Sequence, residues 1–259
     1  MNLLFWNLYK KDNSKHVADI LDENNIDIGI FSEYDNIDFS KLELELNNIY
    51  SVYLGMGGCE KVFMIAKNEY SITVCRENTR YTLYICETIN EKYIIAGIHL
   101  PPNPTSNAES RKNIIRDIVS DVTELEKRSK IMNTIVIGDF NASPFDSELV
   151  QKDAFNAVMY KELINKDEII TYEGKRYKRF YNPILNYISE ENKTYGSYYY
   201  SGTIDSLYWF CYDQVIVRKP LVDAIKHIGY CKKIKDKNLM STVRPNRTIS
   251  DHLPLLVEM

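Results

Sequence analysis

Residues 134–141 have the sequence TIVIGDFN, an apolar run that ends in a glycine, an acid, an aromatic residue and an amide. The run predicts a short buried strand, with the side chains of Asp139 and Asn141 delivered at its end. Residues 250–257, SDHLPLLV, have the same construction in the opposite order, because an acid and His252 precede an apolar run. Both polar groups are therefore expected at the rim of a buried sheet, where catalytic side chains are commonly placed.

The bulk composition is that of an ordinary globular chain. Its 259 residues are 44% apolar and 26% charged, which argues against disorder. No Gly/Ser-rich or Pro-rich linker divides them, so we expect one domain spanning residues 1–259. No stretch approaches about 18 consecutive apolar residues, and the apolar start, residues 1–6, is too short and wrongly flanked for a signal peptide. We therefore expect a cytoplasmic protein without a membrane partner.

Two classes of chemistry find no support in the motifs. The five cysteines show no Cys-x-x-Cys spacing, and their odd number favours reduced, unpaired thiols inside a cell. Cys75, Cys86 and Cys211 lie in apolar, strand-like runs and are expected in the core, so a thiol nucleophile is a poor hypothesis. The chain also lacks glycine-rich nucleotide-binding loops and the His-x-x-x-His spacing of zinc sites.

The formal net charge of −4 hides an uneven distribution. Residues 1–60 contain eleven Asp/Glu and four Lys, whereas residues 215–247 contain nine Lys/Arg and two Asp. The basic segment leads directly into Ser250-Asp251-His252, and a cationic wall there would suit a phosphate-bearing substrate. A solvated loop without a partner explains the same cations equally well.

Hydrophobic periodicity predicts a mixed α/β chain. Residues 16–24 and 108–128 have the apolar spacing of amphipathic helices. Short apolar runs, many of them at close intervals, indicate antiparallel hairpins. The predicted strands are residues 3–6, 26–31, 50–54, 62–66, 71–75, 81–88, 93–98, 134–137, 204–210, 214–217 and 255–257. Two packed sheets with helices on their outer faces are the expected architecture.

Residues 151–202 are dense in tyrosine and asparagine and show no repeat. They include Tyr195 and three consecutive tyrosines at 198–200, together with the basic run KRYKR at 175–179. Aromatic residues interleaved with cations can stack on unpaired bases while holding phosphates. The tyrosines would equally serve to cap a sheet.

Polar groups placed beside apolar runs recur along the chain, and in order they are Asn7, Glu33, His99-Leu100-Pro101, Gly138-Asp139-Phe140-Asn141, Ile204-Asp205 and Ser250-Asp251-His252. Each is a weak signal alone. Their joint order resembles the endonuclease/exonuclease/phosphatase superfamily typified by DNase I, over nearly the whole chain. The resemblance implies a four-layer α/β sandwich, a divalent cation and hydrolysis of a phosphate ester, without specifying the ester.

The expected metal ligands are Glu33, Asn7 and Asp251. Glu33 offers a hard carboxylate oxygen suited to Mg²⁺, which usually takes only one or two protein carboxylates, keeps several waters and binds substrate phosphate oxygens. Asn7 and Asp251 would complete or support that shell, and Mn²⁺ is expected to substitute. Outside this pattern, Glu33 would be a surface carboxylate and the other two would cap a turn and a strand.

The expected catalytic residues are Asp139, Asn141, His252, Asp205 and His99. Asp139 would orient and deprotonate the attacking water, and Asn141 would donate its amide to a phosphate oxygen. His252 would contact the scissile phosphate as an imidazolium or as a proton donor. Asp205 would hold the His252 ring and favour its charged form.

His99 occupies a position that is histidine in DNase I-like and many phosphatase members and tyrosine in the abasic-site repair branch, so the resemblance argues against an abasic-site enzyme. Alone, this histidine would be interpreted as a strand-end residue bonded to backbone. The candidate substrate-binding cations are Arg111, Lys178, Arg179, Arg244 and Arg247, although the first turn of a surface helix explains Arg111 as well.

These residues favour a Mg²⁺-dependent phosphodiesterase that cleaves DNA or RNA. The alternative is a phosphatase for a small phosphorylated metabolite, an inositol phosphate or a phospholipid headgroup, since the same core serves both. A catalytically idle binding module is disfavoured because every expected polar position is occupied, and a sphingomyelinase-like enzyme because no export signal is visible. The sequence leaves the oligomeric state open.

Overall fold

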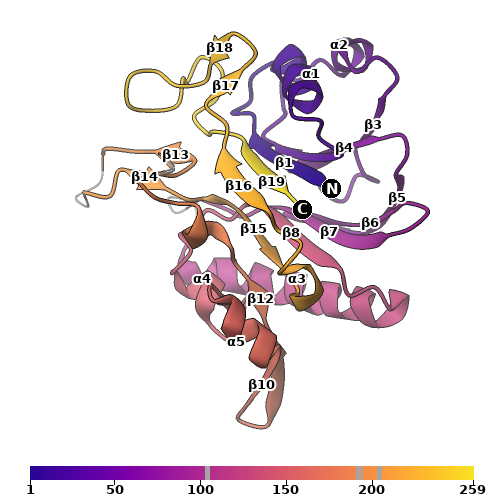
Figure 1. Cartoon of the computed structure of the whole chain (residues 1–259), viewed down its shortest axis with the longest axis vertical. Helices are drawn as coiled ribbons and strands as arrows, with labels where there is room; N and C mark the ends of the chain where they lie inside the picture. The colour runs from indigo at the N-terminus through magenta and orange to yellow at the C-terminus, as the bar shows by residue number, and fades with distance from the viewer. Residues whose placement is uncertain (103–105, 191–192, 194, 203–205) are drawn as a thin grey trace.

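In the computed structural model, which describes residues 1–102, 106–190, 193, 195–202 and 206–259, the chain is arranged in four layers (Figure 1). Two large sheets pack face to face, with α1 (Ser14–Glu23) and α2 (Phe39–Glu45) outside one and α3 (Ala108–Ser129) outside the other. The predicted four-layer α/β sandwich is therefore confirmed. No helix in the described ranges is long and apolar enough to span a membrane.

The first sheet has the strand order β16-β19-β1-β2-β4-β3. β1 and β2, which α1 connects, pair in parallel, and the remaining neighbours pair antiparallel. The strands are β1 (Asn2–Asn7), β2 (Ile28–Ser32), β3 (Tyr50–Tyr53), β4 (Val62–Lys67), β16 (His227–Tyr230) and β19 (Leu255–Glu258). The parallel pair brings the carboxyl ends of β1 and β2 to the same edge.

The second sheet has the strand order β5-β6-β7-β8-β15-β12-β9. β7 pairs in parallel with β8, and β15 runs antiparallel to β8. The strands are β5 (Ser71–Asn78), β6 (Tyr81–Glu87), β7 (Lys92–His99), β8 (Thr134–Asp139), β9 (Ala157–Val158), β12 (Phe180–Tyr181) and β15 (Asp213–Val217). The end of β7, the end of β8 and the start of β15 therefore meet at one edge.

Shorter elements extend from these sheets. The hairpins are β10 (Ile169–Tyr172) with β11 (Lys175–Lys178), β13 (Tyr198–Tyr199) with β14 (Trp209–Phe210), and β17 (Lys233–Ile234) with β18 (Lys237–Asn238). The short helices are α4 (Ser147–Val150), α5 (Lys161–Lys166), and the 3₁₀ turns η2 (Ile184–Asn186) and η3 (Lys219–Leu221).

Helix α3 begins at a capped end and packs through one apolar face. The Asn107 side chain accepts a hydrogen bond from the Ser110 backbone N–H at 2.8 Å, and the helix ends where Lys130 adopts a left-handed φ of 60°. Ile115 and Val122 are fully buried in the apolar cluster that the helix shares with the second sheet. Each such side chain stabilises the packing by about 1.5–3 kcal/mol.

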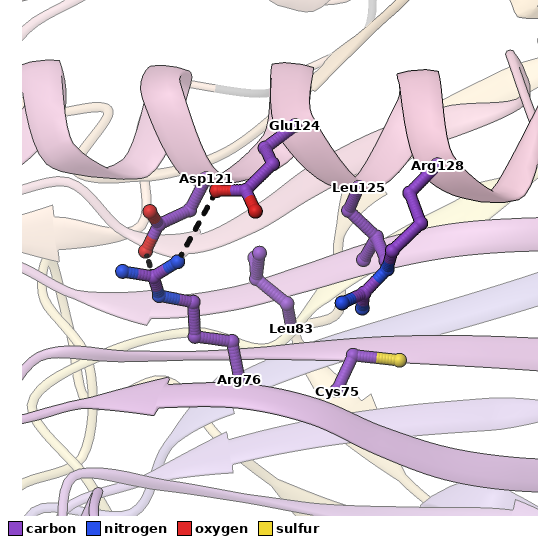
Figure 2. A pocket seen from close by; sticks show the side chains of 7 residues that line it. All are labelled: Cys75, Arg76, Leu83, Asp121, Glu124, Leu125 and Arg128. Atoms are coloured by element: carbon purple, nitrogen blue, oxygen red, sulfur yellow. Dashed lines mark hydrogen bonds and ion pairs between the residues drawn. The ribbon is translucent and has the colours of Figure 1, made fainter.

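Charged side chains fasten the same helix to the edge of the sheet (Figure 2). Arg76 of β5 points toward α3, where its Nε lies 2.7 Å from Asp121 Oδ2 and its Nη1 lies 3.5 Å from Glu124 Oε2. Tyr81 donates its hydroxyl to the same Asp121 oxygen. The cavity that these residues line has a volume of only about 70 Å³. Because Arg76 and both carboxylates are paired with one another, we interpret it as a structural contact.

β7 and β8 approach each other closely at Gly138. A Cβ atom added at this position would fall against the carbonyl oxygen of Ile98, far inside van der Waals contact. Glycine is therefore required for the pairing in which Ile98 lies opposite Gly138 and His99 lies opposite Asp139. This pairing places two predicted site residues side by side where the strands end.

The predicted strand at residues 204–210 is wrong over most of the part that the structure describes. Trp209 and Phe210 form the short strand β14, and residues 203–205 lie outside the described residues. Tyr208 has a left-handed φ of 58°, and its carbonyl accepts the Tyr200 backbone N–H at 2.8 Å. The chain turns there, and so it cannot continue as a strand. Residues 151–202, which the sequence left unassigned, contain β9, α5, β10, β11, β12 and β13.

A buried ion-pair cluster closes one end of the second sheet. Glu126 Oε1 lies 2.8 Å from Arg218 Nε and accepts the Thr134 hydroxyl at 2.8 Å, while Glu126 Oε2 lies 3.2 Å from Lys178 Nζ. Arg218 is completely buried. Glu126 therefore supplies the negative charge that balances a cation without access to water.

We expect Glu126→Ala to lower the free energy of unfolding by about 3–5 kcal/mol, because it leaves the buried Arg218 charge uncompensated. Glu124→Ala is the matched control, since Glu124 is on the same helix, is 66% exposed and makes only a long ion pair; its cost should stay below about 1 kcal/mol. Urea unfolding followed by circular dichroism measures both. Equal stability of the two variants would contradict the role given to Glu126.

Candidate active site

The candidate site is formed where strands of both sheets end at the same edge. In the first sheet, Asn7 and Glu33 come at the carboxyl ends of the parallel strands β1 and β2. In the second sheet, His99 lies opposite Asp139, and Asp139 lies opposite Asp213. The structure thus brings together polar residues that are far apart in the sequence.

Asp139 is a buried carboxylate held by two hydrogen bonds. Its Oδ2 accepts the Asn7 side-chain amide at 3.2 Å, and its Oδ1 accepts the Asn141 backbone N–H at 2.9 Å. Burial and the neighbouring Asp213 charge raise the pKa of Asp139 to about 7, against the opposing effect of His252 and of the two hydrogen bonds. A carboxylate of this kind can accept a proton near neutral pH.

His252 is paired with a carboxylate that favours the protonated form of its ring. Its Nδ1 lies 2.7 Å from Asp213 Oδ2, and both side chains are buried. Burial opposes a charge on His252, but Asp213, followed by Asp139 and Asp251, raises the pKa of the imidazole to about 10. The ring is therefore an imidazolium at neutral pH, with Nε2 left to face a ligand.

Asp213 fills the position beside His252 that the sequence analysis gave to Asp205. Asp205 lies outside the described residues, whereas the contact at Nδ1 is made by Asp213. Among the described residues, the carboxylate beside His252 is therefore Asp213, which the sequence patterns did not single out, and the role expected for Asp205 stays a prediction. A signal was present, because Asp213 directly precedes the predicted strand at 214–217, as Asp139 directly follows the apolar run of β8.

Hydrogen bonds fix the segment that carries His252 against β1. The Ser250 hydroxyl donates to the Asn7 carbonyl at 2.7 Å and accepts the His252 backbone N–H at 3.0 Å. On the other side, Trp6 Nε1 donates to the His252 carbonyl at 3.1 Å. The imidazole is therefore positioned from both its ring and its backbone.

His99 is a buried, neutral imidazole beside two acids. Its Nε2 lies 3.7 Å from Glu33 Oε1 and 3.8 Å from Asp139 Oδ2. Burial, together with nearby cations of which Arg80 comes first, lowers the pKa of His99 to about 3. Its Nδ1 has no hydrogen-bond partner within the described ranges. A neutral imidazole here can still donate one hydrogen bond to an anionic ligand.

Asn141 is anchored by its own backbone and side chain. It adopts a left-handed φ of 46°, and its Nδ2 donates to the Leu100 carbonyl at 2.8 Å. Because a primary amide has two hydrogens, one remains unused by this bond, and the contact with a phosphate oxygen stays a prediction.

Glu33 and Asp251 form the partly exposed side of the site, and their chemistry fits a divalent cation. Burial raises the pKa of Asp251, His252 lowers it, and the charge of Glu33 raises it again. In the described part of the chain, both carboxylates lie within 4.0 Å of a histidine, His99 or His252, and of no lysine or arginine. Two repelling carboxylates, with the Asn7 amide oxygen at the adjacent strand end, are a donor set suited to Mg²⁺ or Mn²⁺.

Asp139, Asp213 and His252 also gather potential ligand atoms, all within 4.8 Å of one another. A histidine must be neutral to bind a metal, and here Asp213 favours the protonated ring. This trio is therefore better suited to proton transfer and anion binding than to holding a cation.

The structure argues against Arg111 as a substrate-binding residue. Its guanidinium is buried, with Nε 2.9 Å and Nη2 2.5 Å from Glu148 Oε1, and Nη1 donates to the Ser106 carbonyl. Burial opposes the charge of Glu148, but Arg111 holds the pKa of that carboxyl below its usual value. The pair fastens α3 to α4, so the predicted role is corrected to a structural one.

Lys178 and Arg179 also lie away from the site. They precede β12, which pairs with the end of β15 that is distant from Asp213. Lys178 Nζ pairs with Glu126, and Arg179 Nη1 donates to the Asp167 carbonyl. Their predicted substrate contacts are therefore replaced by packing contacts inside the fold.

Of the predicted cations, Arg247 remains near the site. Arg247 is close enough to lower the pKa of Asp251 against burial, and Arg244 is exposed in the same loop. Lys235, from the same basic segment, is instead paired with a carboxylate of α1. The expected cationic wall is therefore narrower than residues 215–247.

Comparison with known proteins connects this arrangement to a family. Residues 4–252 match the model of the Endonuclease/Exonuclease/phosphatase family, and no curated protein matches significantly. Among solved structures, truncated TDP2 from Caenorhabditis elegans aligns over 100% of this chain and 97% of its own, with 15% identity and a TM-score of 0.62. The human Nocturnin catalytic domain with bound sulfate anion aligns over 100% of this chain and 92% of its own, with 16% identity and a TM-score of 0.61. The 3′ phosphatase NExo from Neisseria, bound to a product DNA hairpin, aligns over 100% of this chain and 99% of its own, with 12% identity and a TM-score of 0.55.

We expect Arg111→Met to lower the free energy of unfolding by about 3–5 kcal/mol, since it strands the buried Glu148 charge, and to leave KM unchanged. Arg116→Met on the same helix is the control, because its ion pairs are exposed and should contribute less than about 1 kcal/mol. Unfolding and steady-state kinetics below the melting range measure the two effects. A raised KM with normal stability would restore Arg111 as a substrate contact.

Proposed function

Because this chain belongs to the Endonuclease/Exonuclease/phosphatase family, whose model it matches over residues 4–252, we propose that it hydrolyses phosphodiester bonds of DNA or RNA by attack of water, with Mg²⁺ as cofactor. The observation that carries this proposal is the pairing of a buried base with a buried cation. Asp139 has a pKa near neutrality, and His252 is held as an imidazolium by Asp213.

Asp139 would orient the attacking water and take its proton. The Asn7 amide and the Asn141 backbone N–H fix the two oxygens of Asp139, so the carboxylate cannot turn away from the water. His252 would hold the negative charge that develops on the phosphate, with no reorganisation needed at the moment of reaction. His99 and the free amide hydrogen of Asn141 would add neutral donors to the same anion.

Glu33, Asp251 and Asn7 are the residues that would hold the metal. When bound, a divalent cation polarises the phosphoryl oxygen and neutralises charge on the leaving oxygen. The two carboxylates supply most of the protein's share, which agrees with the preference of Mg²⁺ for a few hard oxygens. We expect Mn²⁺ to replace it.

A phosphatase acting on a small phosphorylated metabolite, an inositol phosphate or a phospholipid headgroup is the second candidate. This second function is favoured because Arg111, Lys178 and Arg179 make structural contacts. Few predicted cations then remain to bind a long polyanion such as a nucleic acid. The similar Neisseria structure is described as a 3′ phosphatase. Release of inorganic phosphate from a panel of small esters, without cleavage of oligonucleotides, would favour this second function.

We expect pure protein with Mg²⁺ or Mn²⁺ to cleave labelled single-stranded DNA, double-stranded DNA or RNA, and EDTA to abolish the cleavage. Asp139→Asn should reduce kcat by about 10²–10⁴-fold, because the amide cannot accept the proton of the water. Gel analysis of product lengths measures both. Cleavage that persists in Asp139→Asn would indicate a contaminating nuclease, and no cleavage of any of these substrates would contradict the proposal.

The Asp213–His252 pair should act as a unit. Asp213→Asn and His252→Gln are each expected to lower kcat by about 10²–10³-fold, because either change removes the imidazolium. The double variant should be little worse than the more damaged single variant, since the second change removes nothing further. Multiplicative losses in the double variant would show that the two residues act independently.

A further inference from the structure

A hollow of about 260 Å³ is lined by residues that take no part in the roles assigned above. Its lining comes from β14, from the segment before β13, from the residue after Cys231 and from the loop after β18. In Figure 1 the β13–β14 hairpin lies on the same side of the molecule as the β17–β18 hairpin and the loop that follows it. Because pockets for drug-sized ligands measure about 300–1,000 Å³, this smaller hollow suits a single ring system.

The walls of the hollow combine aromatic faces with a cation. The ring centroids of Tyr195 and Trp209 lie 6.3 Å apart, and Lys232 Nζ lies 5.4 Å from the Tyr195 centroid. Met240 and Val243 contribute apolar surface from the loop. Tyr195 is 40% exposed and Val243 is 59% exposed, so these groups are available to a ligand. Aromatic faces beside a cation are the combination that binds a base and its phosphate.

Tyr198 connects the hairpin that lines the hollow to the catalytic group. Its ring centroid lies 4.9 Å from that of His252, and the two residues form a β-bridge. The next residue, Tyr199, pairs across the hairpin with Trp209. Because neighbouring residues of a strand point to opposite faces, Tyr198 packs on His252 from one face of this hairpin and Trp209 lines the hollow on the other face. Arg247, from the loop that also lines the hollow, interacts electrostatically with Tyr198.

We propose that this hollow binds one unpaired nucleobase of the strand whose phosphate is held at His252, so that the enzyme acts on single-stranded or frayed nucleic acid. This inference rests on the function proposed above. A base inside a duplex has both faces stacked and its edge paired, so it reaches a protein pocket only after leaving the stack. Lys232 lines the hollow, Arg244 and Arg247 belong to the loop that also lines it, and these cations would contact the phosphates of that strand.

Binding can be followed through Trp209. The chain has two tryptophans, and the other one, Trp6, is fully buried. Asp139→Asn protein, used to prevent cleavage, is titrated with a thymidine hexanucleotide, with an abasic oligonucleotide of the same length, and with a blunt duplex. We expect the hexanucleotide to quench the fluorescence and the abasic strand and the duplex to bind about 5- to 150-fold more weakly, the range that stacking of one base provides.

Trp209→Leu in the same background should weaken hexanucleotide binding by the same factor, measured by anisotropy of a labelled strand. Tyr172→Leu is the matched control, because Tyr172 is 48% exposed on the β10–β11 hairpin at the far end of the second sheet. Tyr195→Ala is a second variant of the hollow, and its exposed position makes a folding defect from the substitution small.

Several results would overturn the inference. They are equal affinities for the hexanucleotide and the abasic strand, equal affinities for the hexanucleotide and the duplex, and equal effects of Trp209→Leu and Tyr172→Leu. Loss of binding to anionic phospholipid vesicles in Trp209→Leu, with oligonucleotide binding unchanged, would assign the hollow to a lipid surface instead.

Hydrolysis of bis(p-nitrophenyl) phosphate by protein with Asp139 intact separates this inference from the proposed function. Hydrolysis of this ester together with Trp209-independent oligonucleotide binding would overturn the base site alone. Trp209-dependent binding without hydrolysis of any ester would overturn the catalytic function and leave the base site standing.

Discussion

Three ionisable groups share a buried space at the centre of the site, and the balance among them determines what each can do. Asp139 and Asp213 are acids with almost no exposure to water, and His252 is the cation nearest to both. The His252 imidazole makes its 2.7 Å contact with Asp213, so it compensates the negative charge of Asp139 less completely. Burial and the repulsion from Asp213 therefore raise the pKa of Asp139. Neighbouring groups whose pKa values are pushed apart in this way provide a base and a cation in one place.

This balance depends on the packing of the two sheets, because neither sheet contains the whole site. The first sheet and the segment before β19 supply Asn7, Glu33 and His252, whereas the second sheet supplies His99, Asp139 and Asp213. The contacts from Asn7 to Asp139 and from His252 to Asp213 both cross from one sheet to the other. Close-packed interiors deform little, so the apolar core between the sheets holds these distances constant.

Sequence patterns predicted the fold and the convergence of most site residues. A polar residue directly before or after an apolar strand lies at the end of that strand, and therefore at the edge of the sheet. The patterns did not distinguish Asp213 from Asp205, since both acids accompany apolar residues. The distinction comes from the register of β15 on β8, which is a long-range property of the folded chain. The roles of Arg111 and Lys178 were missed for the same reason, because their partners, Glu148 and Glu126, are 37 and 52 residues away. A short window of sequence does not identify such partners.

The close approach of β7 to β8 at Gly138 constrains how this chain can change over generations. A side chain at position 138 would press on the Ile98 carbonyl and spread the two strand ends that carry His99 and Asp139. Other strand pairings hold the sheet together, so such a change would impair catalysis more than it would impair folding. A lineage that kept the fold but no longer needed catalysis would be free to lose this glycine, and its loss in a descendant would mark that release.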